Sequence, residues 1–200
     1  MMLPTHALVG MALAVPLAVH SPTLATAALL GGLVGGVLPD LDLYWGHRRT
    51  LHYPTLYPLA VVPAAIAAFV WTVPATVALA VALLAAAAHC RMDVYGGGLE
   101  LRPWEGTSDR AVYDHVRGEW LRPRRLVPYD GSRGDLALSA IAGVPLLLLL
   151  DGVFAAAAGA ALVVAVVYTL LRRQLADLAA SVFRRVPAPL AGYVPERYLH

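Results

Sequence analysis

Seven histidine and aspartate side chains lie at or near the ends of successive apolar segments of the chain, where charged and polar groups are costly in a bilayer. These side chains are His6, Asp40, Asp42, His47, His52, His89 and Asp93. Imidazole nitrogens and carboxylate oxygens are ligands that zinc, manganese and iron all accept. The set therefore predicts a metal site for one or two divalent ions, with zinc or manganese as the leading candidates.

The clearest local pattern is the pair His89 and Asp93, which are four residues apart and so project from one face of a helix. Taken alone, a hydrogen bond between the two side chains would explain this spacing equally well. Taken together, however, the four imidazoles and three carboxylates exceed the three or four protein ligands that one zinc usually takes. We therefore expect either two ions bridged by an Asp, or one ion whose ligands are oriented by further carboxylates.

Two arginines, Arg48 and Arg49, lie between the predicted ligands His47 and His52. Guanidinium groups bind phosphate through paired hydrogen bonds, and the same charge also suits them to lipid headgroups. The chemistry that this set favours is metal-assisted hydrolysis by an activated water. We expect Arg48 and Arg49 to bind the substrate, Arg48 to stabilise developing negative charge, and Asp42 to act either as general base or as a ligand.

The elements that must position these residues are strongly apolar. Of the 200 residues, 59% are hydrophobic and 14% are charged, against about 25% charged residues in a typical soluble domain. Apolar segments occupy residues 6–20, 23–38, 55–71, 74–89, 136–150 and 152–171. Because three of the connections are very short, we predict an all-α polytopic transmembrane helical bundle of about six helices in three hairpins. The glycines of residues 31–36 should let a neighbouring helix approach closely.

Charge is distributed unevenly about this predicted bundle. Six crossings place the N-terminus, residues 39–54, residues 90–135 and the tail from residue 172 on one side of the membrane. All 15 basic residues are Arg and fall in these parts, so the positive-inside rule predicts that this side, with both termini and the site, is cytoplasmic. Residues 1–21 lack the basic n-region of a signal peptide, so we expect them to form the first helix of a cell-membrane protein.

We expect a single integral membrane domain over residues 1–200, with residues 94–135 as a polar cap on the cytoplasmic side. Within the cap, Ser108 and Asp109 precede residues 110–121, a pattern that predicts an N-capped amphipathic helix. His115 could reach the site from this helix as an acid or base, although a surface position is the more common one.

The order and spacing of these motifs resemble a known family. The motifs are Pro4-Thr5-His6 with Gly10, the stretch from Gly35 to Asp42, His47-Arg48 with His52, and His89 to Asp93 followed by Tyr95-Gly96. They are similar to those of the membrane-bound metal-dependent hydrolases, which include the LexA-regulated inner-membrane hydrolases. The resemblance covers the first half of the chain and implies that the seven histidines and aspartates are metal-site residues. The chain departs from the family at Leu51-His52-Tyr53, where Thr-His-Ser is usual, and at Arg49, where a small residue is common.

A site at headgroup depth beside arginines favours a phosphoester or another lipid-like anionic substrate, with membrane lipid as the main partner. A net charge of +2 does not favour nucleic-acid binding, and the lone Cys90 excludes a cysteine-based zinc site. One alternative is a non-catalytic membrane protein with a structural metal site or a partner-binding cap. A metal transporter is a weaker alternative, because transporters place their sites near the bilayer midplane.

Overall fold

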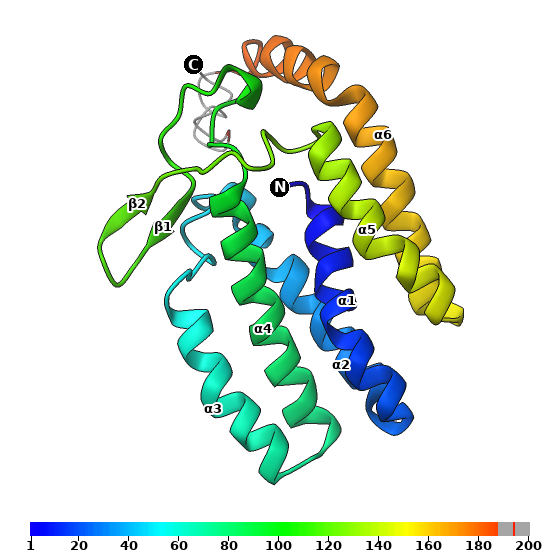
Figure 1. The fold of residues 1–200 in the computed structure, drawn as a ribbon. Coiled ribbons are helices and arrows are strands. Elements are labelled where there is room, and N and C mark those ends of the chain that lie inside the picture. Colours follow the sequence, from blue (N-terminus) through cyan, green and yellow to red (C-terminus); the bar gives the residue numbers. More distant parts are fainter. Residues whose placement is uncertain (188–193, 195–200) are drawn as a thin grey trace.

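The computed structural model describes residues 1–187 and 194, and these residues form a helical bundle with one small hairpin (Figure 1). The α-helices are α1 (Leu3–His20), α2 (Pro22–Val37), α3 (Leu56–Val70), α4 (Pro74–Tyr95), α5 (Arg133–Leu149) and α6 (Gly152–Phe183). The 3-10 helices are η1 (Leu38–Tyr44) and η2 (Pro103–Glu105), and the strands are β1 (Val112–Asp114) and β2 (Glu119–Leu121). The predicted all-α bundle is confirmed.

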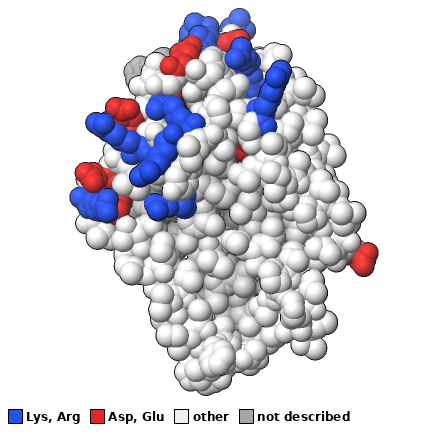
Figure 2. Space-filling model, viewed as in Figure 1, with Lys and Arg blue, Asp and Glu red and all other residues white. Residues whose placement is uncertain are grey.

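Four helical stretches are long and apolar enough to cross a membrane, namely α1, α2 with η1, α4 and α6, while α3 is a shorter apolar helix. Large apolar side chains such as Phe69 and Leu148 are exposed on the sides of the bundle, as expected for a surface in contact with lipid. Figure 2 shows the charged side chains gathered mainly at one end of the molecule, with most of the helical surface uncharged. The length and apolar composition of these helices, together with their exposed apolar side chains, identify the chain as a membrane protein.

Glycines on two faces of α2 bring three helices into close contact. A Cβ atom at Gly32 would lie 2.2 Å from the carbonyl oxygen of Gly10 in α1, and one at Gly35 would lie 2.0 Å from that of Ala82 in α4. Only glycine permits such an approach of backbones, as in other membrane bundles. The predicted close approach is confirmed, and it draws together the N-terminal end of α1 and the C-terminal ends of α2 and α4.

The helix predicted for residues 110–121 is wrong, because this segment forms the β1–β2 hairpin. The strands pair in antiparallel register, with Val112 opposite Leu121. Asp114 ends β1, and its Oδ1 accepts hydrogen bonds from the backbone N–H groups of Val116 and Arg117, while Gly118 adopts a φ of +70°. These local bonds favour a turn over a helix, and the β-branched and aromatic residues beside the turn suit strands.

The last helix extends well beyond the predicted end at residue 171. Its final part bends over the segment between α4 and α5 (Figure 1). Residues 94–95 and 133–135 of the predicted cap belong to α4 and α5, so from here on the cap is residues 96–132. Arg172 of α6 pairs with Asp130 of the cap at 2.9 Å, and Asp177 pairs with Arg102 at 2.9 Å. These ion pairs hold the charged end of α6 against the cap. Arg197 and His200 lie outside the described residues.

Candidate metal centre

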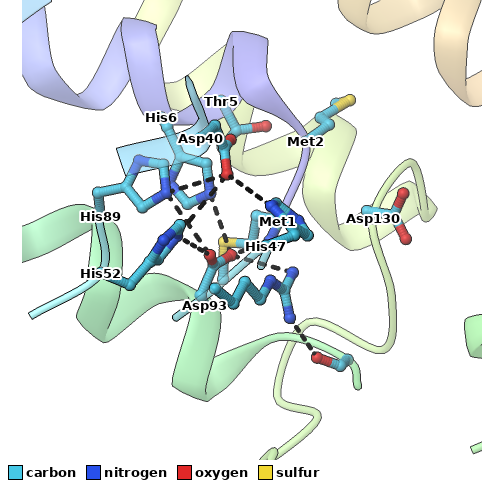
Figure 3. A network of polar contacts seen from close by, with 12 residues as sticks. Met1, Met2, Thr5, His6, Asp40, His47, His52, His89, Asp93 and Asp130 are labelled. Atoms are coloured by element: carbon cyan, nitrogen blue, oxygen red, sulfur yellow. Dashed lines mark hydrogen bonds and ion pairs between the residues drawn. The ribbon is translucent and has the colours of Figure 1, made fainter. Parts of the chain in front are cut away.

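Four side chains that could hold a metal ion meet where the C-terminal ends of α2 and α4 approach the start of α1. They are Asp40 from η1, His52 from the loop before α3, and His89 and Asp93 from the last turns of α4. One ligand atom from each residue lies within 4.8 Å of the ligand atoms of the other three. Figure 3 shows these side chains turned toward one another.

The ring of His52 is oriented so that its Nε2 atom faces this centre. Its Nδ1 lies 2.9 Å from Oδ2 of Asp42, and because an ionised carboxylate only accepts, Nδ1 carries the proton. The lone pair of a neutral ring is then on Nε2, which lies 3.4 Å from Asp93 and 3.7 Å from Asp40. Nε2 of a neutral His52, a hydrogen-bond acceptor, thus faces the carboxylate oxygens of Asp93 and Asp40, which are also acceptors.

His89 is held in the same way by a different partner. Its Nδ1 donates a hydrogen bond of 2.7 Å to the carbonyl oxygen of Gly36, which leaves the lone pair of the neutral ring on Nε2. That atom lies 3.4 Å from Oδ1 of Asp40 and 3.5 Å from Oδ2 of Asp93. Donation of Nδ1 to an oxygen acceptor is the usual way in which proteins orient a metal-binding imidazole.

The donor set fits a divalent cation. Among the described residues, Nε2 of His52, Nε2 of His89 and Oδ2 of Asp93 are buried without a hydrogen-bond partner. If both rings are neutral, their two lone pairs and the two carboxylates directed at one point repel one another, and leaving buried polar atoms unsatisfied costs about 1–3 kcal/mol each. A metal ion would satisfy all of them at once, and two His with two Asp match the ligand number of zinc.

Asp93 is the most heavily contacted member of the group. Its Oδ1 lies 3.1 Å from Nε2 of His6, 3.2 Å from Nη2 of Arg48 and 2.5 Å from the amino group of Met1. The His6 ring also stacks on the His89 ring, with centroids 3.6 Å apart. His6 and Arg48 therefore lie beside the group of four and hold Asp93 in place, while Nη1 of Arg48 donates to the carbonyl oxygen of Gly97 at 2.8 Å.

Asp42 lies behind His52, away from the other acceptors. It is fully buried, and besides His52 its oxygens accept from Nδ1 of His47 at 3.1 Å. The backbone N–H groups of Arg48, Arg49 and Leu51 also donate to it. A buried carboxylate that accepts five hydrogen bonds orients its donors, so the structure places Asp42 as support for two imidazoles and not at the point where ligands converge.

The remaining predicted residues lie further out. His47 contacts Asp42 and lies 3.9 Å from Oδ1 of Asp40. The exposed Arg49 places its guanidinium group 4.7 Å from the ring centroid of Tyr113 in the hairpin. His115 donates from Nε2 to the backbone carbonyl of Arg49 at 2.6 Å, which anchors the hairpin to the loop that carries the site.

Two adjoining cavities open beside the centre. The membrane-side cavity, about 560 Å³, is lined by Asp40, His47, Arg48, the start of α1 and one face of α6. The arginine-lined cavity, about 980 Å³, is lined by Arg49, by Arg184, and by Arg102, Arg110 and other residues of the cap. Leu43, His47 and residues 99–101 line both cavities, so the two cavities adjoin at these residues.

Sequence reasoning missed a polar network that ties α1 to α5. Asp135, at the start of α5, accepts hydrogen bonds from Thr5 at 2.7 Å and from the backbone of Met2 at 2.8 Å, and Thr5 also contacts Ser139. This network fixes the first turn of α1 and so the position of His6. The sequence signal for this network was Asp135, an acidic residue directly before an apolar segment. A carboxylate in that position is costly unless it has hydrogen-bond partners.

No family model, curated protein or solved structure matches this chain. The side chains of the site and their surroundings therefore carry the functional information.

Proposed function

We propose that the protein is a membrane-embedded, metal-dependent hydrolase that acts on a phosphoester or a similar anionic, lipid-like substrate. The order of its ligand motifs resembles that of the membrane-bound metal-dependent hydrolases. The proposal also rests on the cluster of Asp40, His52, His89 and Asp93 at the charged end of a bundle of membrane-spanning helices.

The observation that carries this proposal is the partial exposure of Asp40. Its side chain is 15% exposed and lines the membrane-side cavity, whereas the side chains of His52, His89 and Asp93 are at most 1% exposed. A structural metal site is closed by protein ligands, while a catalytic one keeps a position open. Four protein ligands would fill a tetrahedral site, so a water would have to join them as a fifth ligand from the cavity beside Asp40, a coordination number that catalytic zinc can reach. This access for water favours catalysis over a structural role, and a position at the end of the bundle disfavours transport.

Asp40, His52, His89 and Asp93 would hold the ion, with Asp42 and the carbonyl oxygen of Gly36 orienting the two imidazoles. A bound divalent ion supplies Lewis acidity, which lowers the pKa of water and polarises a phosphoryl oxygen. Arg49 lines the arginine-lined cavity and would attract the anionic group of the substrate.

His47 is the best-placed residue to move a proton. It lines both cavities, and its Nδ1 contact with Asp42 fixes the ring so that the lone pair is on Nε2. Hydrolysis adds the oxygen of water to phosphorus and breaks the P–O bond to the leaving alcohol. The proton that water loses passes through His47 to the oxygen of that alcohol. This assignment replaces Asp42, which is buried behind the imidazoles, as the general base.

The test is metal content by mass spectrometry on protein purified in detergent after growth with added zinc and manganese, alongside hydrolysis of the soluble phosphodiester bis(p-nitrophenyl) phosphate. We expect stoichiometric metal in the wild type, its loss in His89→Ala and Asp93→Ala, and its retention with loss of activity in His47→Gln. His20→Ala, an exposed histidine at the end of α1 opposite the site, is the matched control. A wild-type protein that holds no metal would refute the proposal.

A further inference from the structure

We propose that the substrate is a lipid phosphoester that extends in two directions from the metal centre. Its apolar chain lies in the membrane-side cavity along α6, and a further anionic group beyond the phosphoester lies in the arginine-lined cavity. This inference rests on the proposed function, since it assigns the substrate class of the same site. It adds Val164 as a residue that contacts the chain, and Arg110 and Arg184 as residues that bind the head group.

The membrane-side cavity has both polar and apolar lining. Asp40, His47 and Arg48 line it next to the metal centre. Val164 of α6 also lines it, in the part of the helix that carries no charged residue, and its side chain is 53% exposed. Because α6 is apolar enough to span a membrane, Val164 faces lipid and the cavity opens sideways into the bilayer beside it.

The depth of the cavity matches an apolar chain. The α6 residues that line it share one face, and they are Val164, Tyr168, Arg172, Leu175, Ala176 and Ala179. Arg172 lies at the charged end, where it pairs with Asp130 of the cap, and no charged residue occurs in residues 152–171. Val164 lies eight residues deeper, about 12 Å along the helix. A water-soluble substrate gains nothing from a cavity that reaches this far into the hydrocarbon layer.

The arginine-lined cavity suits a second, anionic group. Four arginines line it, against the two acidic residues Glu100 and Glu105, so its lining is net positive. Arg110 and Arg49 are each braced over an aromatic ring of the hairpin, at 5.7 Å from the centroid of Trp120 and 4.7 Å from that of Tyr113. Arginines held in this way bind phosphate groups with less loss of side-chain entropy than mobile ones. The cavity shares His47 with the membrane-side cavity, beside the metal centre.

Native mass spectrometry on the metal-replete protein in detergent tests whether the apolar chain of the lipid binds in the membrane-side cavity. The method distinguishes bound ligand from bound product by mass. The probes are farnesyl diphosphate, farnesyl monophosphate and inorganic diphosphate. We expect both farnesyl compounds to bind the wild type more tightly than inorganic diphosphate, and Val164→Trp to weaken farnesyl binding about tenfold, a change of about 1.4 kcal/mol. Val163→Trp is the matched control, since Val163 is also exposed, at 64% against 53% for Val164, but does not line the cavity.

The same probes test the head group. The wild type should prefer farnesyl diphosphate to the monophosphate, and the double variant Arg110→Ala with Arg184→Ala should lose that preference while still binding the chain. Arg117→Ala, an exposed arginine of the hairpin that does not line the cavity, should keep it.

Three outcomes would overturn the inference: equal binding of inorganic and farnesyl diphosphate, an unchanged affinity in Val164→Trp, or an unchanged preference in the double arginine variant. These outcomes are separate from failure of the proposed function, which is measured by metal content and by hydrolysis of the small soluble phosphodiester. A protein that binds the lipid as expected but never cleaves any phosphoester would retain this site and lose the hydrolase assignment.

Discussion

The Nδ1 atoms of His52 and His89 each donate to a fixed acceptor, and this determines which nitrogen is left for a metal. The acceptors are Oδ2 of Asp42 and the carbonyl oxygen of Gly36, at 2.9 and 2.7 Å. The two histidines differ in one respect that experiment can use. The acceptor of His52 is a side chain that mutation can change, whereas the acceptor of His89 is backbone.

The variant Asp42→Asn should weaken metal binding without removing a ligand. An amide has one acceptor oxygen in place of two, so it cannot accept from both His47 and His52 while also binding the backbone N–H groups around it. Loss of such an orienting partner typically costs about 10–100-fold in metal affinity. Competition with a fluorescent zinc chelator measures the change. Affinity equal to that of the wild type would show that Asp42 does not orient His52.

At the scale of the elements, the position of the site depends on the close contacts of α2 with α1 and α4. Gly35→Ala would place a methyl group 2.0 Å from the carbonyl oxygen of Ala82, so α4 would have to shift away from α2. We expect a loss of about 1–3 kcal/mol in stability, together with weaker metal binding, because α4 carries His89 and Asp93. Thermal unfolding in detergent and metal titration measure the two effects.

The control for this substitution is Gly159→Ala in α6. There a Cβ would meet only a methyl carbon of Leu147 at 3.7 Å, which is ordinary contact. Because alanine favours a helix over glycine by about 1 kcal/mol, this variant should be as stable as the wild type or more so. Equal destabilisation of both variants would show that the close approach of α2 and α4 at Gly35 is not the cause of the lost stability.

The junction between α6 and the cap should make stability depend on pH. Burial alone would raise the pKa of Asp130, but the charge of Arg172 and hydrogen bonds from Arg172 and Tyr168 outweigh burial and lower it. A lowered pKa in the folded state contributes stability above the unfolded pKa, and this stability is lost as pH falls through the folded value. The unfolding temperature should therefore drop on acidification below about pH 4, where an unfolded Asp titrates. The Asp130→Asn variant should have a lower unfolding temperature than the wild type at pH 7, and that temperature should fall less on acidification. An equal dependence of the unfolding temperature on pH in the two proteins would contradict this account.

At the scale of the whole molecule, the gathering of charge at one end predicts its orientation. The lone native cysteine, Cys90, is buried, so single cysteines can be introduced and labelled selectively. Under the positive-inside rule, Thr107→Cys in the cap should resist a membrane-impermeant maleimide in intact spheroplasts, whereas Thr72→Cys in the α3–α4 connection should react. Both should react after permeabilisation. The opposite pattern would place the cap outside the cell.

Local sequence patterns were sufficient to predict the helical bundle and part of the candidate site. Long apolar runs can satisfy their backbone only as helices in lipid, so the bundle followed from composition. The spacing of His89 and Asp93 follows from helical periodicity, and their grouping with Asp40 was expected from their place at helix ends. Local patterning failed in residues 110–121, where side-chain bonds of Asp114 to the following backbone favoured a turn.

The roles within the site depended on contacts between residues that are distant in the sequence. Asp40 and Asp42 are two residues apart and chemically identical, yet Asp40 faces the other ligands and a cavity while Asp42 is buried behind His52. Similarly, the orientation of His89 depends on a carbonyl oxygen of α2, whose distance is set by glycine contacts between helices. Residue type and spacing determine which groups are available for chemistry. Which of them converge is decided by the packing of helices, because that packing fixes the direction in which each side chain points.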